Sequence, residues 1–197
     1  MIATYLQREV ATKDELPRFL IVCEGKKTEP NYFKALSATI KVSVTVKIEG
    51  LGDNTDSLVR QAIALKQQDD YLQTWCVFDR DSFPPDRFNR AIALAEANGI
   101  QVAYSNEAFE LWYILHFEYL QAGLPRAGYN VKLSDHLGTK YAKNSQTIYN
   151  DLIARQPVAI RNATRLLATY DPPSPERDNP STKVHLLVQE LNRFRHD

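Results

Sequence analysis

Two short and largely apolar runs, at residues 19–23 and 74–78, stand out in the hydrophobic pattern of this chain. Runs of this kind are typical of strands that are buried on both faces of a sheet. Residues 42–48 instead alternate between β-branched apolar and polar side chains, which predicts a half-exposed strand at a sheet edge. Residues 100–104 predict a fourth short strand.

Helical patterns separate these strands. Apolar side chains recur at helical spacing after Thr28, after Asp56 and after Pro85, and residues 107–120 predict a further, aromatic-rich helix. Strands that alternate with helices indicate a doubly wound α/β fold. We therefore predict a mainly parallel, Rossmann-like sheet of four strands with helices on both faces, in which the first strand lies between the second and the third.

The pattern changes beyond Gly123, where helices and polar turns replace the alternation of strands and helices. Helices are predicted at residues 145–154, 159–169 and 182–194, and the proline-rich stretch at 171–180 predicts a loop. We expect a lead-in over residues 1–18, an α/β domain over 19–122, and a helical extension over 123–197 that packs on the same core.

Composition narrows the class of protein. The chain is 44% hydrophobic and 24% charged, and no apolar run approaches the roughly 18 residues that span a bilayer, so no membrane association is expected. Cys23 and Cys76 fall in predicted buried strands, which suggests reduced thiols without a disulfide. The first residues lack the apolar core of a signal peptide, and we therefore expect a cytoplasmic location.

Carboxylates follow two of the predicted strands. Glu24 and Gly25 come directly after the first strand, and Asp79 and Asp81 come after the third. If these strands are neighbours, the three carboxylates converge at the carboxyl edge of the sheet, where oxygen ligands suit Mg²⁺ or Mn²⁺ and phosphodiester chemistry. Taken alone, the same residues are also compatible with a solvated loop acid and a DxD pair that has no function.

Several motifs in this order resemble the RloB family, whose members are small Toprim-domain proteins. The resemblance covers residues 19–191 and rests on IVCEG at 21–25, TEPNYF at 28–33, FDRD at 78–81, NEAFELWYILHF at 106–117, and NPST at 179–182 with the following Val184 and His185. It implies a Toprim-like, Mg²⁺- or Mn²⁺-dependent nuclease that acts on DNA or RNA in anti-phage defence beside an AAA-type ATPase. It also implies that Glu24 is a general acid/base near the metal and that Asp79 and Asp81 bind the metal.

The FELW…LHF stretch of this family contains Glu110 and His116, which would lie about 120° apart around an ideal helix and cannot both point into one site. We favour Glu110 as a further acidic residue of the site, while His116 is either a phosphate contact or a core histidine. The other candidates for phosphate contacts are Lys26, Lys27, Lys143 and His185, within a broader basic set that adds Lys140, Arg161, Arg165 and Lys183.

Two other functions stay open at this point. The chain carries 24 basic and 24 acidic residues, and this balance does not itself indicate nucleic-acid binding. A non-cleaving sensor or scaffold for the ATPase, or a Toprim phosphotransferase that acts on a small phosphorylated ligand, would suit a neutral chain. A homo-oligomer is compatible with the sequence.

Overall fold

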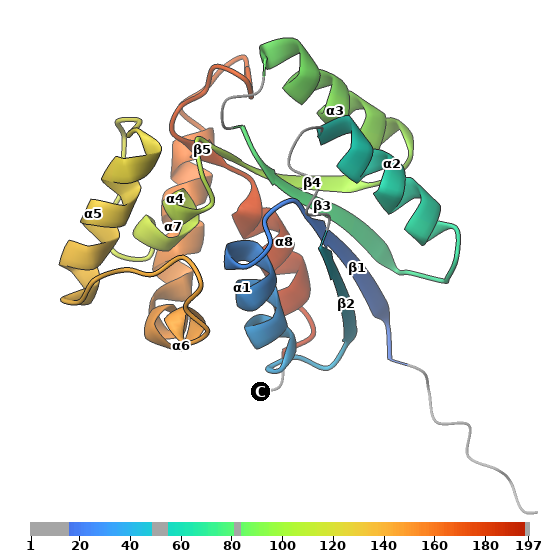
Figure 1. The fold of residues 1–197 in the computed structure, drawn as a ribbon, viewed down its shortest axis with the longest axis horizontal. Coiled ribbons are helices and arrows are strands. Elements are labelled where there is room, and N and C mark those ends of the chain that lie inside the picture. Colours follow the sequence, from blue (N-terminus) through green and yellow to red (C-terminus); the bar gives the residue numbers. More distant parts are fainter. Residues whose placement is uncertain (1–15, 49–54, 81–83, 196–197) are drawn as a thin grey trace, which may run out of the picture.

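A five-stranded, mostly parallel sheet forms the centre of the computed structural model, which describes residues 16–48, 55–80 and 84–195 (Figure 1). The strand order is β2-β1-β3-β4-β5. The pairs β1–β2, β1–β3 and β3–β4 are parallel, and β4–β5 is antiparallel. The strands are β1 (Arg18–Cys23), β2 (Ser43–Ile48), β3 (Gln73–Asp79), β4 (Gln101–Asn106) and β5 (Ser181–Thr182).

The fifth strand corrects the prediction of four strands. β5 has only two residues, both small and polar, so neither an apolar run nor an alternation marks it in the sequence. Polar contacts hold it against β4: the Thr182 hydroxyl donates to the Tyr104 carbonyl at 3.0 Å, and the hydroxyls of Ser105 and Thr182 lie 3.0 Å apart. The predicted neighbourhood of the first and third strands is confirmed, as is the α/β class.

Helices cover both faces of the sheet (Figure 1). They are α1 (Thr28–Ser37), α2 (Thr55–Lys66), α3 (Pro85–Ala97), α4 (Glu110–Ile114), α5 (Arg126–Leu137), α6 (Ile148–Leu152), α7 (Gln156–Leu167) and α8 (Val184–Asn192), with a 3₁₀ turn, η1 (Ile153–Arg155), between α6 and α7. The helices α2 and α3 lie on one face, and α1, α4, α7 and α8 lie on the other.

Several helices differ from the sequence prediction. The helix expected over residues 107–120 is regular only in α4, and the helix expected over 145–154 begins at Ile148 and ends in the 3₁₀ turn. Helix α5 had no predicted range, because it buries only Tyr129 and Leu133 and leaves Val131 63% exposed. An apolar stripe that weak does not distinguish a helix from a polar connection.

Alternation along β1 explains its continuous apolar run. Phe19, Ile21 and Cys23 belong to the apolar cluster on the face of α1 and α8, whereas Leu20 and Val22 belong to the cluster on the face of α2 and α3. All five side chains are fully buried, so β1 is the centre of both cores. The edge strand β2 is half exposed, as its alternating sequence predicts.

Buried side chains of α5, α7 and α8 join the same apolar cluster as β1. The boundaries of the expected lead-in, α/β domain and helical extension remain a prediction. Cys23 and Cys76 are both buried free thiols, and they belong to clusters on opposite faces of the sheet. In the part of the chain that the structure describes, no helix has the length and apolar character needed to cross a membrane.

Candidate functional site

The carboxyl ends of β1 and β3 form one side of a small pocket. Glu24 follows β1, and its backbone N–H donates to the carbonyl of Val77 at 2.9 Å, which extends the β1–β3 ladder by one residue. Asp79 is the last residue of β3, and its backbone N–H donates to Oε2 of Glu24 at 3.3 Å. Since β2 and β3 flank β1 on opposite sides, this is the point where the strand order reverses and where open α/β sheets bind ligands.

The pocket has a volume of about 260 Å³ and is unusually rich in charge. Four carboxylates and three cations line it, together with small and aromatic residues. The carboxylates are Glu24, Glu29, Asp79 and Glu110; the cations are Lys26, Arg126 and Lys143; the others are Gly25, Thr28 and Phe109. Four negative and three positive groups leave a formal charge of −1 when all seven are ionised.

Helix α1 brings Glu29 into this pocket. The side chain of Glu29 is only 5% exposed, and it packs against the backbone of the turn that follows β1. A Cβ atom at Gly25 would collide with the Glu29 carboxylate, so any larger residue here would force this buried side chain to move. The glycine of the strand-to-helix turn thus fixes where the second acidic residue lies.

Helix α4 and the segment after α5 supply the opposite wall. Glu110 begins α4 and is 3% exposed; the Tyr141 hydroxyl donates to its Oε1 at 3.3 Å, and Nζ of Lys143 lies 3.6 Å from the same atom. The hydroxyl of Thr28 donates to the Lys143 carbonyl at 3.1 Å. These contacts tie the loop that carries Lys143 to the start of α1.

Arg126 completes the wall from the first turn of α5. Its Nη2 atom donates to Oδ2 of Asp79 at 2.8 Å, in an ion pair whose carboxylate is 11% exposed and whose guanidinium side chain is 38% exposed. The pair offsets only part of the negative charge that the four carboxylates bring together.

Crowding of carboxylates in a buried space changes their proton affinity. Burial, followed by the nearby Glu29 and Glu110 carboxylates, raises the pKa of Asp79 well above its usual range, and Arg126 opposes this rise. Burial, together with Glu110 and Glu24, raises the pKa of Glu29 to about 7. Perturbed acids of this kind are characteristic of sites that move protons or bind cations.

The donor chemistry fits a hard divalent cation. Mg²⁺ commonly uses one or two protein carboxylates and completes its shell with water and substrate phosphate, and Glu24 and Asp79 supply oxygen ligands of this type. Within residues 16–48, 55–80 and 84–195, however, no group of three or more His, Cys, Asp or Glu side chains is arranged to hold a metal ion. The predicted ligand Asp81 lies outside the described residues.

The structure brings only some of the predicted site residues together. Glu24, Asp79, Glu110, Lys26 and Lys143 all line the pocket, whereas Lys27 is exposed and is not among its lining residues. Glu29 and Arg126 also line it, and sequence reasoning missed both. Glu29 resembled an ordinary acid in the first turn of a helix, and Arg126 begins a helix that has almost no apolar signal.

Both histidines that were candidates for phosphate contacts lie in the core. His116 is 1% exposed and its Nδ1 lies 2.9 Å from the Trp112 carbonyl, while His185 is 2% exposed in the first turn of α8. Burial lowers the pKa of each to about 4, so both are neutral at physiological pH. Neither lines the pocket, which favours the core interpretation of His116 and argues against a phosphate contact by His185.

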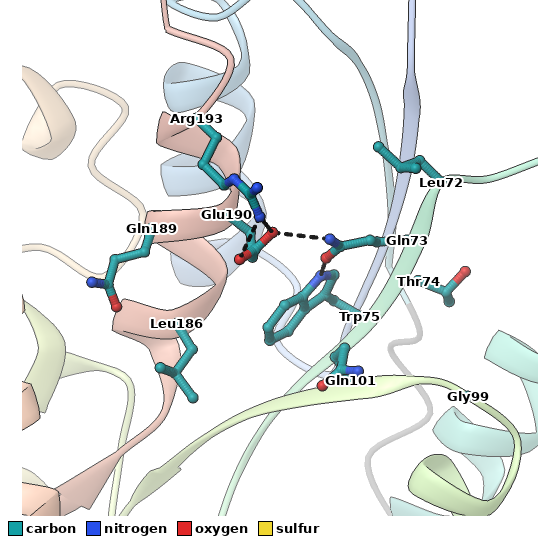
Figure 2. A pocket seen from close by; sticks show the side chains of 10 residues that line it. All are labelled: Leu72, Gln73, Thr74, Trp75, Gly99, Gln101, Leu186, Gln189, Glu190 and Arg193. Carbon is teal, nitrogen blue, oxygen red and sulfur yellow. Dashed lines mark hydrogen bonds and ion pairs between the residues drawn. The ribbon is translucent and has the colours of Figure 1, made fainter.

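A larger hollow of about 700 Å³ lies at the opposite end of the sheet, between the starts of β3 and β4 and helix α8 (Figure 2). Some of its polar groups bind one another: the Trp75 indole donates to Oε1 of Gln73 at 2.9 Å, and Nε2 of Gln73 donates to Glu190 at 3.0 Å. Glu190 also pairs with Arg193 at 3.1 Å. With its charges paired internally, this hollow is less suited to phosphate chemistry than the acidic pocket.

Comparison with known proteins identifies the family. Residues 19–191 match the protein-family model described as RloB-like protein, which covers most of the chain and includes every residue of the acidic pocket. Searches of curated proteins and of solved structures each gave no match. The chain belongs to the RloB-like family.

Proposed function

We propose that the acidic pocket is the active site of a divalent-cation-dependent nuclease of Toprim type, which hydrolyses phosphodiester bonds in DNA or RNA. One observation supports this most strongly: Glu24 and Asp79 meet at the reversal point of the sheet with Arg126 in direct contact. Carboxylates suit the cation and the positive side chains suit the phosphate, so the pocket contains groups for both.

In this proposal Glu24 and Asp79 hold Mg²⁺ or Mn²⁺, with Asp81 as the third ligand that the family motif implies. When bound, the cation would lower the pKa of an attacking water and neutralise charge on the phosphoryl group. Lys26 and Lys143 would bind and orient the phosphodiester, because both line the pocket and both have exposed side chains.

Glu29 is the residue best suited to move a proton. Its pKa of about 7 allows the buried carboxyl group to accept or donate a proton near neutral pH, which is the condition for an effective general acid or base. We therefore assign the general acid/base role to Glu29, whereas the family resemblance implied Glu24 for that role. Glu24 accepts a hydrogen bond from the Asp79 backbone and is better placed as a ligand.

Family membership supports a role in anti-phage defence with an AAA-type ATPase as partner. Such a partner would license the nuclease, because an unregulated nuclease in the cytoplasm would damage the host. A second candidate function is phosphoryl transfer on a small phosphorylated ligand. The volume of the pocket, about 260 Å³, favours this second function. A pocket of this size can hold a phosphate and a sugar, and its described lining residues do not form a long groove.

A cleavage assay separates these functions. Wild type, Glu24→Gln and Asp79→Asn would be incubated with single-stranded DNA, double-stranded DNA or transfer RNA in Mg²⁺ or Mn²⁺, with and without the neighbouring ATPase. Asp86→Asn, which changes an exposed acid at the start of α3, is the matched control. Cleavage that is lost in the first two variants and retained in the control would support the nuclease.

The absence of cleavage under every condition, with Mn²⁺ binding that still depends on Asp79, would contradict the nuclease and favour the sensor or the phosphotransferase. Hydrolysis or transfer of phosphate from a mononucleotide would then identify the phosphotransferase.

A further inference from the structure

Arg126 binds the carboxylate that we assign to the cation. The guanidinium Nη2 atom is 2.8 Å from Oδ2 of Asp79, whose side chain is 11% exposed. A divalent cation on the same carboxylate would bring two positive centres within a few ångströms of each other in a poorly hydrated space. Their repulsion favours a state in which only one of the two occupies Asp79.

Arg126 is placed to leave without a rearrangement of the fold. It is the first residue of α5, and its side chain is 38% exposed, so rotation about its side-chain bonds can carry the guanidinium towards solvent while the helix stays in place. A second ion pair of the pocket is looser: Nζ of Lys143 lies 3.6 Å from Glu110, beyond hydrogen-bond distance. The geometry thus singles out Arg126 as the cation in direct competition with the metal.

We propose that Arg126 is an internal counter-ion that a divalent cation displaces from Asp79, and that the released guanidinium then binds a phosphate oxygen of the substrate. A guanidinium forms paired hydrogen bonds to phosphate as readily as to carboxylate, so it exchanges one partner for another of similar geometry. This inference rests on the proposed function, since it assumes that Asp79 binds the cation.

The exchange couples two binding events. Without the cation, Arg126 stays on Asp79 and is withheld from the substrate. With the cation bound, Arg126 is available, so cation and phosphodiester each increase the affinity of the pocket for the other, by the same factor. The cation therefore binds before Arg126 contacts the substrate, and the pocket binds nucleic acid only weakly in the absence of metal.

A competing explanation gives the opposite prediction. If Arg126 instead holds Asp79 in the orientation that the cation requires, its removal weakens metal binding. Mn²⁺ affinity, measured by electron paramagnetic resonance without nucleic acid, distinguishes the two. We expect Arg126→Gln to bind Mn²⁺ about twofold to fivefold more tightly than wild type, the effect of removing one partly exposed charge pair.

The matched control is Arg193→Gln, which removes the same charge from the pair with Glu190 at the other end of the sheet. We expect its Mn²⁺ affinity to equal that of wild type, which shows that a change in net charge alone has no effect. Arg126→Lys keeps the charge but loses the planar fork, and we expect near wild-type Mn²⁺ affinity. Circular dichroism would verify that each variant is folded.

The coupling itself is measured with a short phosphorothioate oligonucleotide that resists hydrolysis, by fluorescence anisotropy with and without Mn²⁺. Wild type should bind about tenfold more tightly with Mn²⁺. Arg126→Gln should keep only the part that comes from direct contact between the cation and the phosphate, which makes its gain about twofold to fivefold smaller, and Arg126→Lys should lie between them. Weaker Mn²⁺ binding by Arg126→Gln, or full coupling in that variant, would overturn the inference and leave the nuclease proposal standing. Wild type that binds no Mn²⁺ through Asp79 would overturn both.

Discussion

Substitution of Gly25 by alanine tests whether the turn after β1 is shaped by Glu29. The added methyl group would collide with the buried Glu29 carboxylate, and overpacking of this kind costs about 1–3 kcal/mol. Gly25 does not have a positive φ, so alanine also gains about 0.4–1 kcal/mol by restricting the unfolded chain. The free energy of unfolding should therefore fall by up to about 2.6 kcal/mol, with a central value of about 1 kcal/mol.

A double-mutant cycle isolates the collision. In a Glu29→Ala background the space is vacant, so Gly25→Ala should be neutral or stabilising by up to about 1 kcal/mol, and the coupling between the two sites should be about 1–3 kcal/mol. Urea unfolding followed by circular dichroism measures all four proteins. Gly128→Ala is the control. Gly128 lies inside α5, and a Cβ there would meet Leu124 at an ordinary contact distance of 3.4 Å. This substitution should increase the free energy of unfolding by up to about 1 kcal/mol. Equal effects of Gly25→Ala in both backgrounds would refute the reasoning.

Three further predictions concern protons and phosphate. Glu29→Gln should reduce the cleavage rate by about 100-fold or more and flatten its pH dependence around pH 7, since the variant has no proton to exchange. Buried His116 and His185 should each lower the stability of the fold as pH falls from 6.5 to about 4, because the unfolded chain protonates these histidines first. The raised pKa values of Glu29 and Asp79 act in the opposite direction over this range. In His116→Gln, the slope of the free energy of unfolding against pH, measured by urea unfolding, should therefore fall by up to about 1.4 kcal/mol per pH unit. Lys26→Ala should weaken oligonucleotide binding in an anisotropy titration, whereas the adjacent Lys27→Ala, outside the pocket lining, should not; equal effects would contradict the assignment.

The sequence predicted the strands well where burial leaves a strong pattern. The apolar run of β1 and the alternation of β2 follow directly from their places at the centre and the edge of the sheet. The convergence of Glu24 and Asp79 was predictable for the same reason, since parallel neighbours bring their carboxyl ends together. Periodicity therefore predicted the strands, and the topology of a parallel sheet predicted that these two carboxylates meet.

Tertiary contacts determine the parts that the sequence did not predict. β5 exists because hydroxyl groups of Ser105 and Thr182 meet across two strands that are far apart in the chain. Glu29 and Arg126 carry no local signal, because an acid in a first helical turn and an arginine beside proline are common on protein surfaces. Only the packing of α1 and α5 around the end of the sheet makes these two residues part of one site.

The net charge of the whole chain does not indicate how charges are distributed in the folded protein. The equal numbers of acidic and basic residues do not themselves indicate nucleic-acid binding, yet Lys26, Arg126 and Lys143 gather in one pocket. In the basic set expected from the sequence, His185 is buried and neutral, the Arg165 guanidinium lies 4.1 Å from the centre of the Tyr119 ring, and Lys183 Nζ lies 5.5 Å from that of Tyr104. Burial removes His185 from this set, whereas Lys140, Arg161 and Arg165 are exposed. Local phosphate contacts in the pocket and contacts over a broader basic face therefore remain two alternatives.

The salt dependence of binding distinguishes these two arrangements. Each phosphate neutralised on a single strand contributes about −0.7 to the slope of log affinity against log salt concentration, so three pocket cations predict a slope of about −2. If the broader basic set also contacted the backbone, the slope would approach about −5. Anisotropy titrations of single-stranded oligonucleotide from low to high salt would measure it. A slope near the steeper value, unchanged in Lys26→Ala, would mean that the surface binds nucleic acid and that the pocket contributes little to affinity.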